Sequence, residues 1–255
     1  MYPLIPISST LNIPTYYLVL SLTVSVSLIW LVWRADRFHL SRKVTLDLSL
    51  IIMVTGFIGG RLFHVLYEDF DYYRENGARV FYFWNGGFVF YGGAILASLF
   101  SMLYLSYRVK SAYAEYLDLF APVLAFSYIL GRCACLLAGC CYGRYCDLPW
   151  AVAGRHPTQA YAALWELGAL MILLGIEKVP QAQRKPRFLS YAGAVFYLWV
   201  VLHAAGRLVM ETYRDDFRGP SLGLSISSWI SILLILLSGY LLFRNPTSRR
   251  STLST

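Results

Sequence analysis

Three arginines stand inside apolar stretches of the sequence, where a permanent charge is costly. Arg61, Arg132 and Arg207 each follow a glycine directly. A charge at membrane depth costs at least about 2.5 kcal/mol, so each arginine is expected to face the interior of a helical bundle and to have a partner there. A guanidinium presents a fork of donors that matches phosphate oxygens. The three arginines therefore predict a site for an anionic headgroup; the alternative for any one of them is a side chain that reaches the external interface.

Further polar residues recur at helical spacing around the last of these arginines. The set comprises His203, Arg207, Glu211 and Arg214. Steps of four, four and three residues place these side chains on one face of a helix. Arg207 and Arg214 are suited to clamp a phosphate, whereas Glu211 fits an internal pair with arginine at least as well as it fits a catalytic role.

A histidine stands at the expected start of another apolar helix. His156 comes just before Pro157, and proline is tolerated in the first turn of a helix. The open backbone donors of such a turn attract anions. His156 is therefore a candidate substrate contact, with a helix cap as the alternative.

All cysteines of the chain fall in one short segment. They are Cys133, Cys135, Cys140, Cys141 and Cys146. Their spacing matches no common zinc pattern such as paired C-x-x-C, so the sequence predicts no metal site. A disulfide in an oxidising compartment is compatible with the last three, while the first two fit as small helix-packing residues.

The composition indicates whether the segments that carry these residues are surrounded by water or by lipid. The chain has 255 residues, of which 58% are hydrophobic and only 14% charged, against roughly 25% charged in soluble domains. A net charge of +8 raises the question of nucleic acid, but no basic stretch is interleaved with aromatics in a soluble-looking segment. We therefore expect an all-α membrane protein that does not bind nucleic acid.

Seven apolar runs are long enough to cross a bilayer. They cover about residues 16–33, 44–66, 88–107, 116–137, 158–176, 188–210 and 222–243. Lys and Arg number thirteen in the loops on one side and six on the other, which predicts an external N-terminus and a cytoplasmic C-terminus. We expect one transmembrane domain over residues 1–244 and a short cytoplasmic tail over 245–255.

Six blocks of residues resemble those of a known family. In order they are Gly59 to Arg61, Trp84 to Gly87 with Tyr91 to Gly93, Asp118 to Pro122, Gly131 to Arg144, Arg155 to Tyr161, and Gly206 to Asp215. With these blocks the sequence resembles the prolipoprotein diacylglyceryl transferases, multi-pass enzymes of the bacterial inner membrane. The resemblance runs from about Tyr16 to the last helix.

The resemblance implies a reaction without a cofactor. A diacylglyceryl group moves from phosphatidylglycerol to the lipobox cysteine of a preprolipoprotein signal peptide, which forms a thioether and releases glycerol phosphate on the external side of the membrane. By position, Arg132 matches the family's lipid-binding arginine and Arg207 its second essential arginine. We expect support for substrate binding from Arg61, Arg214, Glu211, Tyr16 and His156.

The sequence differs from the family at the positions of the candidate proton acceptors. The family's histidine before two glycines is Tyr91, and a phenol, with a pKa of about 10, is a weak base. A family tyrosine four residues before Arg207 is His203, which offers another titratable group. Either Tyr91 or His203 is therefore the expected catalytic proton acceptor.

Other departures fall on polar positions of the family. Its usual asparagine and acidic residue after Arg132 correspond to Cys135 and Cys140, and its acid after the His156 block corresponds to Ala162. Three alternatives stay open: a transferase with another thiol acceptor or lipid donor, a non-catalytic phospholipid-binding paralogue, and a membrane thiol-redox protein. The arginine pattern has no role in the last of these and weighs against it.

Overall fold

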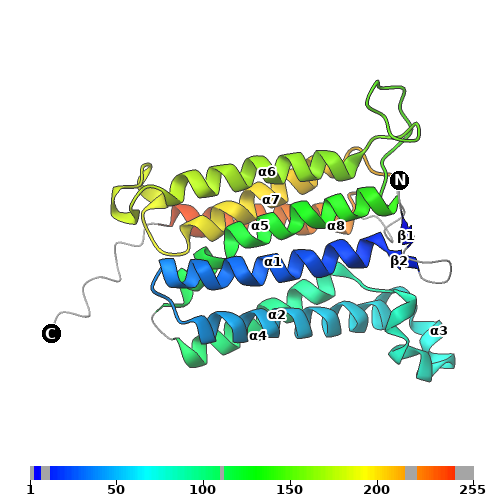
Figure 1. Ribbon diagram of the computed structural model, residues 1–255, viewed down its shortest axis with the longest axis horizontal. Coiled ribbons are helices and arrows are strands. Elements are labelled where there is room, and N and C mark those ends of the chain that lie inside the picture. The colour runs from blue at the N-terminus through cyan, green and yellow to red at the C-terminus, as the bar shows by residue number, and fades with distance from the viewer. Residues whose placement is uncertain (1–2, 7–11, 110–111, 216–222, 245–255) are drawn as a thin grey trace. The chain divides into compact units, whose positions relative to one another are not determined.

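A computed structural model describes residues 3–6, 12–109, 112–215 and 223–244 (Figure 1). In this part of the chain, seven helices are long and apolar enough to cross a membrane. They are α1 (Thr15–Arg37), α2 (Arg42–Phe63, continued by a π-helical turn to Glu68), α4 (Phe90–Arg108), α5 (Tyr113–Ala138), α6 (Thr158–Glu177), α7 (Ala194–Glu211) and α8 (Ile226–Phe243). The prediction of seven helices long and apolar enough to span a membrane is confirmed.

The chain forms two compact units. The first comprises Met1–Leu31 and Ala114–Thr255, and the second comprises Val32–Tyr113. The expectation of a single domain over 1–244 stays a prediction, and the predicted tail lies outside the described residues.

Two short strands precede the first helix. β1 (Leu4–Pro6) pairs antiparallel with β2 (Asn12–Pro14). The sequence did not predict this hairpin, because three-residue strands ending in proline show no alternation of apolar and polar residues. The described chain is mostly helical rather than all-helical.

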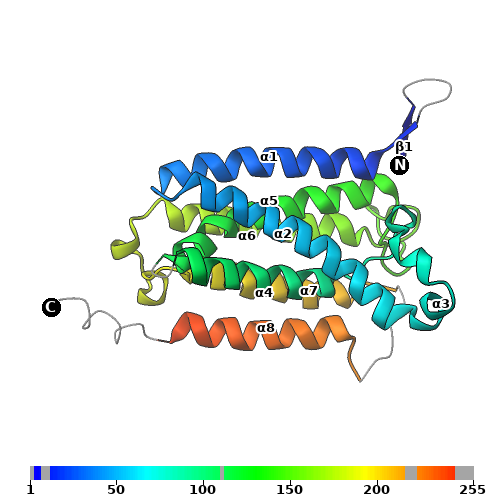
Figure 2. The same ribbon diagram turned by 90° about the horizontal axis from the view of Figure 1, so that it is seen from below.

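In the first unit, α7 lies beside both α6 and α8 (Figures 1 and 2). Ala121 and Ala125 of α5 are fully buried at a spacing of one turn, against Leu173 of α6 and Val195 of α7. Small residues at such positions let helix backbones approach closely in a membrane. Ser27 of α1 and Ser127 of α5 share a hydrogen bond of 2.8 Å between their hydroxyls, which joins the first helix to this bundle.

The start of α7 is fixed by a carboxylate from α5. Both oxygens of Asp118 accept backbone hydrogen bonds, from Gly193 at 2.7 Å and from Phe196 at 2.9 Å. These are donors that a helix N-terminus leaves without an intrahelical partner. The helix therefore begins at Ala194, after a left-handed Gly193, and not near residue 188 as the apolar run predicted.

In the second unit, α2 and α4 lie side by side through their glycines (Figure 1). A Cβ atom at Gly93 would lie 2.6 Å from the carbonyl oxygen of Gly56. The backbone amide of Val89 donates to the carbonyl of Gly60 at 2.9 Å. Glycine is required at this crossing because no side chain fits between the two backbones. A short helix, α3 (Phe70–Glu75), follows α2.

Candidate functional site

A buried carboxylate and a histidine pair between two helices of the first unit. Nδ1 of His203 on α7 lies 3.0 Å from Oε2 of Glu166 on α6. The other oxygen, Oε1, accepts a 2.6 Å hydrogen bond from the indole nitrogen of Trp199. Glu166 is 1% exposed. With both its oxygens engaged, the carboxylate holds the imidazole in one orientation, as in carboxylate–histidine pairs that present the other ring nitrogen to a substrate.

Aromatic contacts connect this pair to an arginine. The ring of Tyr128 meets that of His203 edge to face, with 4.6 Å between centroids. Cζ of Arg132, one turn further along α5, lies 4.7 Å from the centroid of the same tyrosine. Among the described residues, no carboxylate pairs with Arg132. A cation held by an aromatic face keeps its N–H donors available for the oxygens of an anion.

The second arginine of the first unit has an acidic partner. Nη2 of Arg207 lies 2.8 Å from Oε2 of Glu211 and donates to the hydroxyl of Ser227 on α8 at 3.2 Å. Arg207, His203 and Tyr128 line one small cavity of about 10 Å³. His203, Arg207 and Glu211 share one face of α7 as their spacing predicted, and Glu211 is the partner of Arg207. The placement of Arg214 on the same helix face was wrong, because α7 ends at Glu211 and Arg214 forms a backbone bridge with Gly143 instead.

The segment after α5 packs against the end of α7. The amide of Arg144 donates to the carbonyl of Tyr213 at 2.9 Å, and Nε of Arg144 donates to the carbonyl of Arg214 at 3.3 Å. Arg214 itself is buried. A Cβ at Gly143 would lie within 2.8 Å of both Thr158 and His156. Gly143 and Arg144 therefore attach this segment to residues 213 and 214, just beyond the end of α7.

The predicted substrate contact His156 lies among aromatic rings. Its ring centroid is 5.1 Å from that of Tyr213 and 6.1 Å from that of Tyr161, whose hydroxyl lies 3.3 Å from Nδ1 of the histidine. Tyr16, in the first turn of α1, is 37% exposed and packs edge to face on Tyr17. Substrate contact by either residue stays a prediction.

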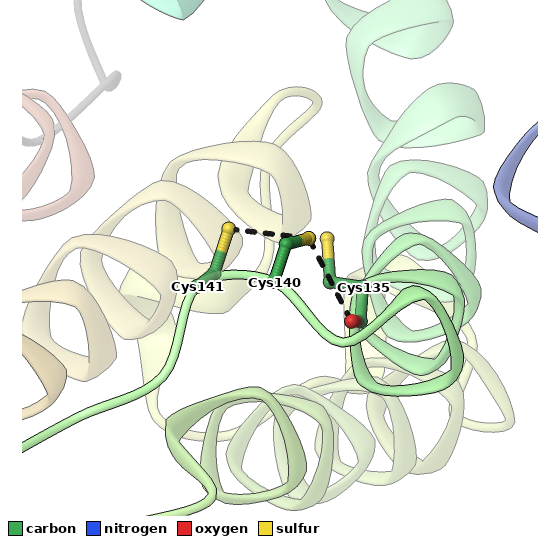
Figure 3. Close-up of side chains that lie close together, drawn as sticks. All are labelled: Cys135, Cys140 and Cys141. Atoms are coloured by element: carbon green, nitrogen blue, oxygen red, sulfur yellow. Dashed lines mark hydrogen bonds between the residues drawn. The ribbon is translucent and has the colours of Figure 1, made fainter. Parts of the chain in front are cut away.

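Three of the five cysteines come together. The sulfurs of Cys135, Cys140 and Cys141 all lie within 4.8 Å of one another (Figure 3). Those of Cys140 and Cys141 are 3.6 Å apart, and all three are free thiols. Hydrogen bonding to the thiol of Cys135, then to that of Cys140, together with the charges of Arg214 and Arg132, lowers the pKa of Cys141 to about 5 against the opposing effect of burial. This cluster therefore carries a thiolate near neutral pH.

The predicted residues Arg61 and Tyr91 belong to the second unit. Arg61 is 8% exposed and donates to backbone carbonyls of the segment 79–87, among them Gly86 at 2.6 Å and Arg79 at 2.9 Å. It fixes the shape of this segment and lines a cavity of about 260 Å³ together with His64 and Arg79. Tyr91 stands in the first turn of α4, with its ring 5.6 Å from that of Phe90.

Sequence reasoning missed Glu166. The spacing along α6 could have identified it. The family resemblance places an acid at the position of Ala162, and Glu166 lies four residues later, on the same face of the helix. Both line the cavity that contains His203 and Arg207. The carboxylate therefore enters the same cavity from the next turn of the helix.

Comparisons with known proteins identify the family of the chain. The sequence profile of a family described as prolipoprotein diacylglyceryl transferase matches residues 3–244. Three curated relatives are each named phosphatidylglycerol–prolipoprotein diacylglyceryl transferase. The protein of Polynucleobacter asymbioticus is 34% identical over 227 residues, which cover 84% of each chain. That of Idiomarina loihiensis is 33% identical over 76% of this chain and 74% of the relative, and that of Photobacterium profundum is 32% identical over 82% and 78%.

Proposed function

Since the chain belongs to the prolipoprotein diacylglyceryl transferase family, we propose that it transfers a diacylglyceryl group from phosphatidylglycerol to the lipobox cysteine thiol of a preprolipoprotein. The sulfur attacks the glycerol carbon that bears the phosphate. A C–S bond forms, the C–O bond breaks, and glycerol phosphate leaves with the electron pair. The two requirements are a proton acceptor for the thiol and positive charge at the leaving phosphate.

Arg132 is the proposed holder of the phosphate. Its guanidinium lies over Tyr128 without a carboxylate partner among the described residues, and phosphate oxygens match the donors it presents. Arg207 adds a second positive charge on the cavity beside His203. Arg214, Tyr16 and His156 are proposed to contribute to substrate binding as the family resemblance implies. For Arg61, whose three side-chain nitrogens all donate to backbone carbonyls of the segment 79–87, the proposed contribution is to hold that segment in shape.

His203 is the proposed proton acceptor, and Glu166 its positioning residue. Of the two candidates from the sequence, only His203 is joined to a buried carboxylate at hydrogen-bonding distance among the described residues. An imidazole accepts a proton near neutral pH far more readily than a phenol such as that of Tyr91. The orienting carboxylate stabilises the imidazolium that forms.

The proposed setting is the bacterial inner membrane, with the N-terminus outside and the C-terminus in the cytoplasm. The support is the excess of Lys and Arg, thirteen against six, in the loops assigned to the cytoplasm. On this topology the Glu211 end of α7 and the Thr158 end of α6 face outside, where lipoprotein precursors emerge.

The observation that carries this proposal is the array of Glu166, His203, Tyr128 and Arg132 in one unit. Expression in a bacterium depleted of its own transferase tests it. The chain should restore growth and add a diacylglyceryl mass to a lipobox substrate, and Arg132→Ala should abolish both while Arg187→Ala, at an exposed loop arginine, should not. Phospholipid retained on the purified protein without any transfer would favour the non-catalytic paralogue.

A further inference from the structure

The three-cysteine cluster is built by the local fold. α5 ends at Ala138, and the left-handed Gly139 and Cys141, with φ of 77° and 66°, turn the chain back over its last turn. The amides of Gly139 and Cys140 both donate to the carbonyl of Cys135 at 3.1 Å. This capping arrangement brings the sulfur of Cys135 close to those of residues five and six positions later. The cluster therefore forms without a C-x-x-C spacing in the sequence.

The first turn of α6 holds the cluster from the other side. The hydroxyl of Thr158 donates to the carbonyl of Cys141 at 2.8 Å, and the side-chain amide of Gln159 donates to the carbonyl of Cys140. Thr158 is 3% exposed and Gln159 is 1% exposed. Two buried side chains therefore fix the backbone of two of the cysteines, so that the thiols are held close together before any ligand arrives.

The spacing of the sulfurs suits a metal ion. Sulfurs bound to Zn²⁺ at about 2.3 Å lie about 3.8 Å apart in a tetrahedral site and about 4.0 Å apart in a trigonal one. The sulfurs of Cys140 and Cys141 are 3.6 Å apart, and all three lie within 4.8 Å (Figure 3). A disulfide would instead need a sulfur separation of about 2.05 Å. The three side chains can meet one ion with small rotamer changes.

The chemistry of the donors and of their surroundings points to a thiophilic cation. Thiolates select Zn²⁺ or Cu⁺ over hard ions such as Mg²⁺ and Ca²⁺. Three thiolates around Zn²⁺ carry a net negative charge, and the positive charges of Arg132 and Arg214 lie close enough to act on the cluster. Three protein ligands also leave a fourth position open, as in zinc sites that bind a reacting molecule.

We propose that Cys135, Cys140 and Cys141 bind one thiophilic d¹⁰ cation such as Zn²⁺ and leave a coordination position for the acceptor thiol of the transfer reaction. The role in transfer rests on the proposed function; the metal site does not. A thiol that coordinates such an ion loses its proton, which His203 accepts. The resulting thiolate forms the C–S bond as the C–O bond to phosphate breaks, and no group is oxidised or reduced.

Metal content tests the site independently of activity. The full-length protein in detergent is stripped with a chelator, supplied with Zn²⁺ and desalted, and bound metal per chain is measured by mass spectrometry. One equivalent is expected for the wild type and for Cys146→Ser, whose sulfur lies outside the cluster, and less than a tenth of this for Cys135→Ser. Co²⁺ in place of Zn²⁺ should give sulfur-to-cobalt charge-transfer absorption in the first two proteins only.

The site would be overturned by substoichiometric zinc in the reconstituted wild type, by equal zinc in Cys135→Ser, or by a mapped disulfide within the cluster of freshly purified protein. If Cys135→Ser does not fold, stripping the wild type and restoring it with zinc gives the same comparison.

Transfer assays then separate the two proposals. At least a tenfold loss of transfer on stripping, reversed by Zn²⁺, is expected for the wild type and supports coordination of the acceptor thiol. Unchanged transfer by a stripped protein that Arg132→Ala still inactivates would reject this role and leave the transferase function standing. A protein that binds zinc but transfers no lipid, with or without the metal, would reject the transferase function and keep the metal site.

Discussion

Nδ1 of His203 lies 3.0 Å from Oε2 of Glu166, across the interface of two membrane helices. A carboxylate buried to 1% exposure is stable only when it is hydrogen-bonded or paired, and here the histidine and Trp199 engage one oxygen each. The pair can act on a proton because the partly exposed imidazole of His203 lines the cavity, while Glu166 holds its Nδ1.

Glu166→Gln should lower the rate of transfer by roughly 100-fold or less, since loss of a general base itself costs about 10²–10⁴-fold. The amide keeps the acceptor for Trp199 but removes the charge that stabilises the imidazolium. The maximal rate should fall while the KM for phosphatidylglycerol changes little, measured with a lipobox peptide. Glu177→Gln, at the far end of the same helix, is the control. A rise in KM alone would show that Glu166 acts on lipid binding instead.

Gly206→Ala should destabilise the first unit by about 1–3 kcal/mol, the usual cost of overpacking. An added Cβ would lie 2.9 Å from Cε2 of Trp165 and closer still to other atoms of the indole. That ring is held by its 2.8 Å hydrogen bond to the carbonyl of Leu202.

Thermal unfolding in detergent measures the effect, and Trp165→Leu should partly restore the stability of the Gly206 variant. Gly168→Ala, where nothing lies within 4 Å of the added atom, should be neutral or slightly stabilising. Equal melting temperatures for the Gly206 and Gly168 variants would mean that the indole moves freely.

Asp118→Ala should loosen the start of α7, because the amides of Gly193 and Phe196 lose their acceptor. The expected loss of stability is about 1–2 kcal/mol. Hydrogen exchange of residues 193–197 should increase, while exchange in α4 of the second unit should not. Asp118→Asn keeps one acceptor oxygen and should show a smaller effect. An unchanged exchange rate in Asp118→Ala would show that Asp118 does not cap α7.

Alkylation of Cys141 in metal-free protein should persist below neutral pH. The folded state lowers its pKa from 9.0 to about 5, so the thiolate fraction falls only when the pH approaches 5. By the same linkage, the stability that this thiolate contributes is fully present above pH 9 and is lost as the pH falls from 9.0 through about 5. The rate at which iodoacetamide alkylates Cys141 is measured as a function of pH by peptide mass spectrometry, with Cys146 as the reference thiol. A rate that reaches half its maximum near pH 9 would show that the pKa of Cys141 is not lowered.

The helical architecture was predictable because each span needs about 20 apolar residues, and runs of that length stand out in any sequence. The start of α7 was not, since it depends on the carboxylate of Asp118, seventy-five residues away. The polar face with Arg207 and Glu211 was predictable from the helical period alone.

Two clusters could not be predicted from the sequence. Glu166 lies in the middle of an apolar helix whose other acid, Glu177, is its last residue, and its partner His203 comes from another helix. The cysteine cluster depends on the left-handed turn at Gly139 and Cys141. Neither sequence spacing nor composition predicts these approaches: the first depends on the packing of α6 against α7, and the second on the turn that follows α5.

Lipidation of a synthetic lipobox peptide by the purified protein, supplied with phosphatidylglycerol and followed by mass spectrometry, tests the central claim most directly. The wild type and Tyr91→Phe should both form the diacylglyceryl thioether with release of glycerol phosphate, whereas Arg132→Ala and His203→Gln should form at most a hundredth as much. Full activity of His203→Gln together with loss of activity in Tyr91→Phe would contradict the assignment of the proton to His203, and full activity of Arg132→Ala would contradict the proposed phosphate site.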